Sequence, residues 1–284
     1  MIKNIIYQYL RDKKEADNKI ERNPEYQYHW SPSYYTRCLR QTFYKKIGAP
    51  ISNEISIHSL LKMEAGTGIH HQLKELYRRI ARFYNDDRFQ YIEAEKEYIT
   101  KDWSGITFIY QPDDVISVNG TVFLIENKTK YGQGIEVVKR IGIEKDYEIQ
   151  LLLYMVLENI EQGEFFFLAT DSAYCEDFAY TATALKEKYR DYIRERNEKI
   201  RQVILDVKLY FTTGEKKIPD REGQVNLKKT GDGLKCDFQK DNKKYKSFPC
   251  AWGENRCSYF NMCWREVLDK MRENSYYVDG QFIK

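Results

Sequence analysis

The two residues Asn119-Gly120 constrain the fold of this chain more than any other feature of its sequence. Strand-like runs with alternating apolar residues flank them on both sides. Asn-Gly between two such runs is the strongest short-range signal for a β-hairpin with a two-residue turn. That turn fixes the register of the strands, and counting outward from it places Asp113 directly opposite Glu126. Because side chains alternate between the faces of a sheet, Lys128 emerges on the same face as these two carboxylates.

This face of the expected hairpin carries a reactive set of charges. Directly opposed residues have Cβ atoms roughly 4.5–5.5 Å apart, and two carboxylates that close repel each other unless a cation lies between them. Asp113, Glu126 and Lys128 therefore indicate a divalent-metal site that hydrolyses phosphodiesters, in which the lysine steadies a nucleophilic water or a developing anion. Asp114 and Asn127 are expected together on the opposite face. The alternative is an exposed sheet face that merely happens to be charged.

The composition is that of a soluble globular protein with a real core. The chain has 284 residues, of which 42% are hydrophobic and 31% charged. No apolar run approaches the ~20 residues of a membrane span, and the N-terminus lacks the pattern of a secretory signal. We therefore expect a cytoplasmic protein with no membrane partner. The net charge of +3 excludes a global basic field, although residues 228–246 are rich in lysine.

Apolar periodicity predicts an α/β fold with a mixed central β-sheet flanked by helices. Helices are expected at residues 33–47, 57–83, 147–160 and 183–209. Besides the hairpin, strands are expected within residues 90–111 and at 165–169. Three segments follow: an N-terminal helical segment (1–56), a core (57–210) and a loop-rich C-terminal segment with lysines and clustered cysteines (211–284).

Other polar residues could complete a site beside the hairpin. His70 borders the face of helix 57–83 that is expected to pack on the sheet, so it is either a metal ligand or a core-edge histidine. An imidazole ligand would shift metal preference toward Mn²⁺ over Mg²⁺. Gln150 and Tyr154 share one face of the next helix and could hold a DNA phosphate or the attacking water, or be ordinary helix surface. Lys130 is one of several basic residues that could follow a nucleic-acid strand.

Clustered cysteines form a second candidate site. Cys250, Cys257 and Cys263 lie within fourteen residues, which packing alone explains poorly. Tetrahedral thiolate sets bind Zn²⁺ or an iron–sulfur cluster, and a fourth ligand would be needed. The other three cysteines are Cys38, Cys175 and Cys236. Proximity in sequence favours Cys236 as the fourth ligand and zinc as the metal, and inert buried thiols are the alternative.

These motifs occur together and in the same order in one known family. The series Cys38, Gly66-x-Gly-Ile-His70, Pro112-Asp113, Glu126-Asn-Lys128, Gln150-x3-Tyr154 and three closely spaced cysteines resembles the RecB-like branch of the PD-(D/E)xK nucleases. The similarity spans roughly residues 33–265 and is greatest to the iron–sulfur members, namely the CRISPR-associated adaptation exonucleases and the AddB-type nuclease domains. Asn127 departs from the apolar residue that is usual between Glu and Lys, and Cys250-x6-Cys257 departs from the usual CxxC.

The resemblance implies a restriction-endonuclease-like core and a role for each motif. His70, Asp113 and Glu126 would bind Mg²⁺ or Mn²⁺, and Lys128 would position the nucleophilic water. Gln150 and Tyr154 would lie near the DNA backbone. The ligands of a [4Fe–4S] cluster, stapling the N- and C-terminal segments together, would be Cys38, Cys250, Cys257 and Cys263. This assignment replaces the one that proximity favours, with Cys236 and zinc.

The activity implied is that of a metal-dependent DNA exonuclease acting on single strands or frayed ends. Its partners would be DNA and proteins of CRISPR adaptation, recombinational repair or phage replication. No G-x-x-x-x-G-K-[ST] motif is present, so the chain has no helicase motor of its own. Three rivals remain: a DNA-end-binding adaptor on the same fold, a restriction-type endonuclease, and a zinc-stapled protein in which the charged hairpin is a coincidence.

Overall fold

A computed structural model gives the structure of the chain. It describes residues 5–13, 26–51, 56–92, 99–172, 174–220, 223–230, 233–240, 251–252, 255–256, 259–263, 265, 277–278 and 281–282. These residues fall into two compact units. The sheet unit consists of residues 28–36 and 61–201, and the terminal unit of residues 1–27, 37–60 and 202–284.

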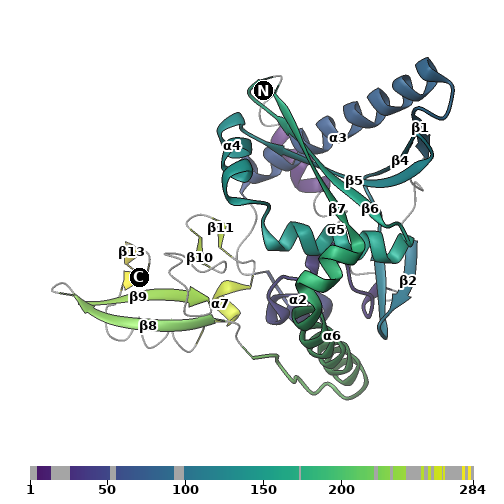
Figure 1. Ribbon diagram of the computed structural model, residues 1–284. Coiled ribbons are helices and arrows are strands. Elements are labelled where there is room, and N and C mark those ends of the chain that lie inside the picture. The colour runs from purple at the N-terminus through teal and green to yellow at the C-terminus, as the bar shows by residue number, and fades with distance from the viewer. Residues whose placement is uncertain are drawn as a thin grey trace. The chain divides into compact units, whose positions relative to one another are not determined.

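A five-stranded mixed sheet organises the sheet unit (Figure 1). Its strands, in spatial order, are β1 (Gln90–Ile92), β4 (Asp114–Val118), β5 (Thr121–Lys130), β6 (Gln162–Ala169) and β7 (Cys175–Thr181). The central pair β5–β6 is parallel and the other three pairs are antiparallel. The predicted α/β class with a mixed central sheet is thus confirmed.

The predicted hairpin is formed by β4 and β5, with the predicted register. Asn119 and Gly120 both have positive φ, 50° and 79°, as the favoured two-residue turn requires. Val118 pairs with Thr121 and Asp114 with Ile125. The turn therefore sets which side chains share a face along the whole ladder.

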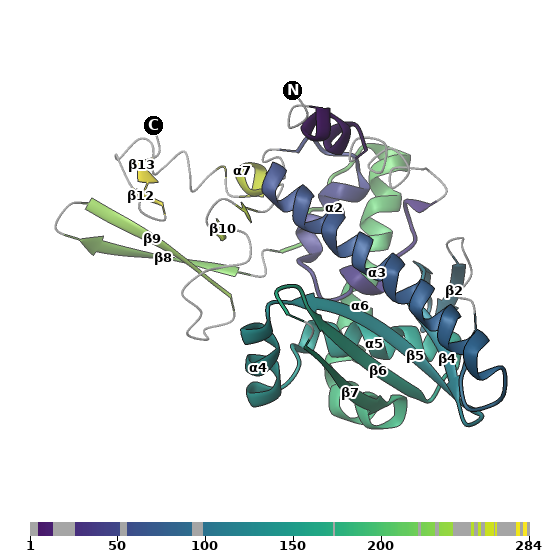
Figure 2. The same ribbon diagram turned by 90° about the horizontal axis from the view of Figure 1, so that it is seen from above.

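Helices cover both faces of the sheet (Figure 2). They are α3 (Ile57–Tyr84), α4 (Gly132–Ile141), α5 (Lys145–Glu158) and α6 (Ala182–Thr213). The glycines at 66 and 68 do not interrupt α3, and a Cβ added at Gly66 would lie 3.9 Å from Thr129 Oγ1, so α3 passes close to β5 there. Tyr77 of α3 hydrogen-bonds to Asn127 on one face of β5, whereas Gln150 of α5 hydrogen-bonds to Glu126 on the other. Helices α3 and α5 therefore pack on opposite faces.

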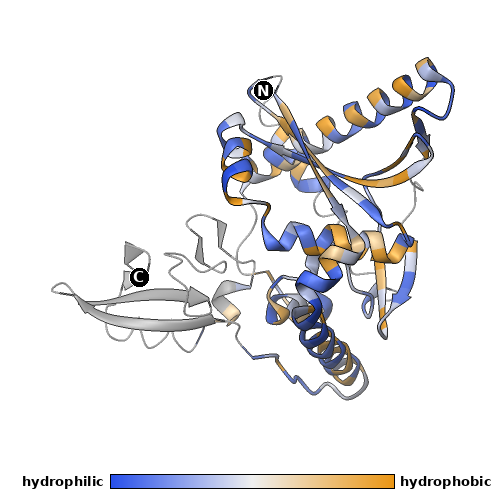
Figure 3. Cartoon of the chain, viewed as in Figure 1, coloured by the Kyte–Doolittle hydropathy of each residue, from blue (hydrophilic) through white to orange (hydrophobic). Residues whose placement is uncertain are grey.

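Helix α5 is the centre of the hydrophobic core. Residues around its whole circumference are buried, including Ile149, Leu151, Leu152, Leu153 and Met155, each at most 1% exposed. On β6, a glycine lets the helix approach, because a Cβ at Gly163 would lie 2.5 Å from Met155 Sδ. By contrast α6 is mostly hydrophilic (Figure 3) and buries only a stripe.

Smaller elements complete the two units. In the sheet unit these are the hairpin β2 (Ile99–Trp103) and β3 (Ile106–Tyr110) and the short 3₁₀ helix η2 (Pro32–Tyr34). The terminal unit contains α2 (Leu39–Lys46) and α7 (Phe260–Cys263), a four-stranded sheet of β8 (Gly223–Thr230), β9 (Gly233–Lys240), β12 (Tyr277–Val278) and β13 (Gln281–Phe282), and a two-stranded sheet of β10 (Ala251–Trp252) and β11 (Asn255–Arg256).

Several predicted elements were wrong in detail. The single helix expected at 33–47 is η2 followed by α2, because the chain is extended at Cys38 (ψ 120°). Strand β7 and helix α4 were not predicted. The segment after residue 211, expected to be loop-rich, contains paired strands. No helix in the described part of the chain is long and apolar enough to cross a membrane.

Candidate active site

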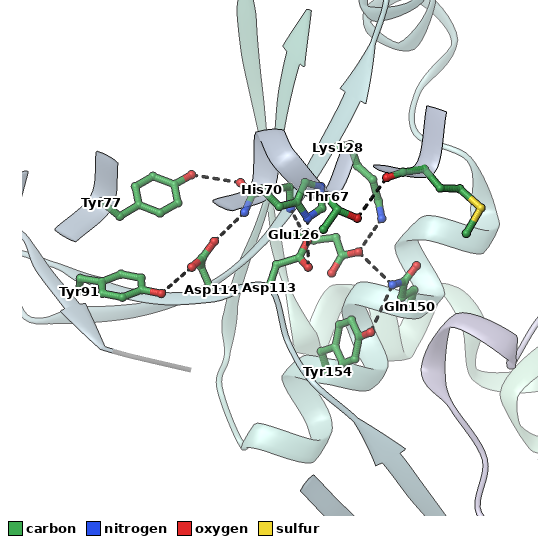
Figure 4. Close-up of polar contacts among 12 residues, drawn as sticks. Thr67, His70, Tyr77, Tyr91, Asp113, Asp114, Glu126, Lys128, Gln150 and Tyr154 are labelled. Carbon is green, nitrogen blue, oxygen red and sulfur yellow. Dashed lines mark hydrogen bonds and ion pairs between the residues drawn. The ribbon is translucent and has the colours of Figure 1, made fainter. Parts of the chain in front are cut away.

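Asp113 lies at the entrance of β4, where three groups from separate parts of the sequence meet (Figure 4). The main-chain N–H of Asn127 donates a hydrogen bond of 3.0 Å to Asp113 Oδ2. His70 Nδ1, from α3, lies 3.5 Å from Asp113 Oδ1. The hydrogen bond to Asp113 raises the pKa of His70, which outweighs the opposite effect of its burial. This carboxylate is thus held by the facing strand and by the covering helix.

Glu126 is buried in the middle of β5, and the described residues donate hydrogen bonds to one of its two oxygens. Its Oε1 accepts hydrogen bonds from Lys128 Nζ at 2.5 Å and from Gln150 Nε2 at 2.9 Å. Its Oε2 is buried and accepts no hydrogen bond from any described residue. Burial, followed by the nearby charge of Asp113, raises the pKa of Glu126 to about 7. The ionised form of this carboxyl therefore needs a further positive partner.

Lys128 is held by a carboxylate and an aromatic ring. Its Nζ makes the ion pair with Glu126 and lies 4.8 Å from the centre of the Tyr147 ring. Burial is the largest single effect on the pKa of Lys128 and lowers it, but the charge and hydrogen bond of Glu126 and the charge of Asp113 together raise it by more, so the ammonium form is stabilised. Lys130 Nζ lies 5.6 Å from the same ring and 3.2 Å from Glu144 Oε1. Tyr147 was missed in the sequence, although its position one helical turn before Gln150 could have indicated it.

Helix α5 closes the other side of the site. Gln150 and Tyr154 lie one turn apart, and Gln150 Nε2 lies 3.3 Å from the Tyr154 hydroxyl as well as close to Glu126. The structure thus brings together six residues that the sequence singled out, while Lys130 lies at their margin through Tyr147. Those six residues are His70, Asp113, Glu126, Lys128, Gln150 and Tyr154.

The donor set suits a hard divalent cation. Two carboxylates and an imidazole are ligands that Mg²⁺ and Mn²⁺ accept. The buried Glu126 Oε2 lacks a hydrogen-bond donor among the described residues, as expected of an atom that takes a cation. Within the part of the chain that is described, no three His, Cys, Asp or Glu side chains already form a closed coordination set. His70 and Asp113 instead contact each other, and a cation would have to separate them.

The cysteines are only partly described. Cys38 caps the N-terminus of α2, and Cys263 is buried at the end of α7. Arg40 Nη1, two residues after Cys38, lies 3.8 Å from Cys263 Sγ. Cys250 and Cys257 lie outside the described residues, and Cys236 lies in β9. The assignment of the four cluster ligands therefore stays a prediction.

Comparison with known proteins places no family name on the chain. No protein-family model matches the sequence, and no curated protein matches it. Solved structures that match include SSO0001 (13% identity, 68% of this chain and 86% of that one, TM-score 0.41). The structure of LHK-Exo in complex with dAMP also matches (16% identity, covering 66% of this chain and 93% of that one, TM-score 0.42). So does LHK-Exo, an alkaline exonuclease from Laribacter hongkongensis (16% identity, 63% and 88% coverage, TM-score 0.38). Similarity this distant assigns neither family nor activity.

Proposed function

We propose that this protein is a divalent-metal-dependent deoxyribonuclease, and specifically an exonuclease that acts on single-stranded or frayed DNA ends. One observation carries the proposal: beside Asp113, the buried Glu126 carboxylate has Lys128 and Gln150 as donors to one oxygen and no donor to the other among the described residues. Such an arrangement costs stability in the absence of a cation. A cation there would neutralise a scissile phosphate, while Lys128 supplies a positive charge beside it.

The side chains divide the work of hydrolysis between them. His70, Asp113 and Glu126 would hold Mg²⁺ or Mn²⁺, which when bound polarises the phosphoryl group and lowers the pKa of a water. Lys128 holds the attacking water through its ammonium group, which Glu126 keeps in place. Gln150 fixes the orientation of the Glu126 carboxylate by donating to Oε1.

The margin of the site offers contacts for a nucleic-acid strand. Lys130 lies next to the half-buried ring of Tyr147, close to Lys128, and would contact a phosphate neighbouring the scissile one. Tyr154, hydrogen-bonded to Gln150, would line the path of the backbone. The preference for free DNA ends is the most specific part of the proposal, and it rests on the resemblance of the sequence motifs to those of the nuclease family.

We also propose that Cys38 and Cys263 belong to one cluster site with Cys250 and Cys257. The proximity of Arg40 to Cys263 supports placing Cys38 and Cys263 in one site, because Arg40 is two residues after Cys38, at the start of α2. A brown preparation with absorbance near 400 nm, lost in Cys38→Ala and Cys263→Ala, is expected. A colourless protein that releases stoichiometric zinc on denaturation would contradict the iron–sulfur assignment.

The test uses the purified protein with 5′- and 3′-labelled linear DNA and with closed circular DNA, in the presence of Mn²⁺, Mg²⁺ or EDTA. We expect linear single strands to be degraded only with metal. Asp113→Asn, Glu126→Gln and Lys128→Met should each lower the rate by roughly 10²–10⁴-fold, the usual range for lost acid–base or positioning groups. Glu187→Gln, on the exposed surface of α6, is the matched control and should keep the wild-type rate.

The rival functions give different outcomes in the same assay. Cleavage of the closed circle would favour a restriction-type endonuclease. Normal DNA binding with no cleavage under any metal condition would favour an end-binding adaptor. Wild-type rates in Asp113→Asn or Glu126→Gln would show that any nuclease activity arises elsewhere.

A further inference from the structure

A second hydrogen-bonded set lies beside the two carboxylates: Figure 4 shows Tyr77, Tyr91 and Asp114 on the side of Asp113 and Glu126 that faces away from Lys128 and Gln150. Asn127 Nδ2 donates to Asp114 Oδ2 at 2.7 Å, and both residues are 1% exposed. The Tyr91 hydroxyl donates to Asp114 Oδ1 at 2.8 Å, and the Tyr77 hydroxyl donates to Asn127 Oδ1 at 3.2 Å. These four residues, the Asn127 network, come from four different elements: α3, β1, β4 and β5.

The Asn127 network is joined to the site through the main chain. Asp114 directly follows Asp113, and Asn127 stands between Glu126 and Lys128. While the Asn127 side chain is bonded to Asp114 and Tyr77, its main-chain N–H donates to Asp113 Oδ2. A residue that points away from the site therefore orients one of its carboxylates.

Tyr77 joins the network to the helix that carries His70. The two residues are seven positions apart on α3, which is two turns, so they lie on the same face of the helix. The ring of Tyr77 also stacks on that of Tyr91, with centroids 6.4 Å apart. Anchoring Tyr77 to Asn127 fixes the rotation of α3 against the sheet, and with it the approach of His70 to Asp113.

A purely structural role explains these polar residues poorly. The hairpin register is already set by the Asn119-Gly120 turn. At two positions that are 1% exposed, a packed apolar pair would be as stable as a buried polar one or more so. What a satisfied buried network adds is a single, rigid arrangement of the elements that it joins.

We propose that Tyr77, Tyr91, Asp114 and Asn127 are positioning residues: they fix the main chain that carries Asp113 and the rotation of α3 that carries His70, so that both side chains can reach one divalent cation. This inference rests on the proposed function and deepens it. The family that the motifs resemble usually has an apolar residue at the position of Asn127. In this chain Asn127 is then the residue that aligns α3 with the sheet.

The test compares two tyrosine-to-phenylalanine variants of the full chain. Tyr77→Phe removes one hydroxyl from the network. Tyr35→Phe, the control, removes a buried hydroxyl that donates to Asn197 Oδ1 at 2.7 Å within the same unit. Free Mn²⁺ is measured by electron paramagnetic resonance during titration of metal-free protein, and kcat and KM are measured on labelled single-stranded DNA.

We expect Tyr77→Phe to weaken Mn²⁺ binding by roughly 10-fold, within the 10–100-fold range of groups that orient metal ligands. Its kcat at fixed Mn²⁺ should fall while KM for DNA changes little. Tyr35→Phe should lose comparable stability in urea without change in Mn²⁺ affinity. Asp114→Asn and Asn127→Asp should each weaken Mn²⁺ binding, and the double variant, which restores an amide–carboxylate pair, should recover most of it.

The outcomes distinguish failure of the positioning inference from failure of the proposed nuclease function. If wild type binds Mn²⁺ and cleaves DNA but Tyr77→Phe matches Tyr35→Phe, the positioning inference is wrong and the proposed function stands. Failure of the swapped double variant to bind better than its single variants would also overturn it. If wild type neither binds Mn²⁺ nor cleaves DNA, both fall together.

Discussion

Replacing Glu126 by Gln should make the metal-free protein less sensitive to pH. The wild-type carboxyl is buried beside Asp113, with Lys128 and His70 as its compensating positive neighbours, and its pKa is raised from 4.5 to about 7. Glutamine keeps the shape of the side chain but cannot ionise. The difference between the two proteins therefore isolates the cost of a negative charge at this position.

The sign and the size follow from proton linkage. Because the folded pKa lies above the unfolded one, the stability that this group contributes is fully present below pH 4.5 and is lost as the pH rises through 7. The difference between 7 and 4.5, at 1.36 kcal/mol for each pH unit, amounts to about 3 kcal/mol. Relative to Glu126→Gln, wild type should lose about that much between pH 4.5 and pH 8.

Urea unfolding in EDTA at several pH values between 4.5 and 8.5 measures this difference. Glu187→Gln, which removes an exposed carboxylate of α6, is the control and should follow wild type. Adding Mn²⁺ at 100 times its Kd should return about 2.7 kcal/mol to wild type, and little to Glu126→Gln. Parallel pH profiles for wild type and Glu126→Gln would refute the claim that Lys128 and His70 compensate the Glu126 charge only in part in the absence of metal.

Two further predictions concern contacts around the site and in the core. Tyr147→Leu removes the aromatic face near Lys128 Nζ, so kcat should fall about 5-fold, as about 1 kcal/mol of cation–π energy implies, while Tyr147→Phe keeps most of the activity in the same DNA assay. Gly163→Ala brings a methyl group to 2.5 Å from Met155 Sδ and should cost about 1–3 kcal/mol in urea unfolding. Met155→Val should then cost less in the Gly163→Ala background than alone, because it removes the overlapping sulfur.

Local signals in the sequence were enough to predict the hairpin and the long helices. The Asn119-Gly120 turn determines the pairing of its two strands, so Asp114 opposite Ile125 could be predicted by counting. Strand β7 could not be found that way. It is an edge strand whose burial alternates only between exposed and half-buried, so it lacks the apolar signal of a core strand. Helix α4 begins with Gly132-Gln-Gly134, which favours a loop locally.

At the site, counting residues along the strands predicts only part of the observed geometry. Alternation along β5 predicts that Glu126 and Lys128 share one face and that Asn127 lies on the other. It says nothing of which helix covers each face, so the contacts of Tyr77 with Asn127 and of Gln150 with Glu126 depend on tertiary packing.

Position 127 shows why one residue can look irregular in the motif and yet fit the structure. An apolar side chain there would satisfy the pattern of a buried strand, but it would leave the Asp114 carboxylate without its amide donor and Tyr77 without its acceptor. Each of these buried groups would then bear the cost of an unmade hydrogen bond, about 1–3 kcal/mol. Asn127 and Asp114 are therefore expected to tolerate substitution only as a pair, which is the reason that the reciprocal exchange is the decisive variant.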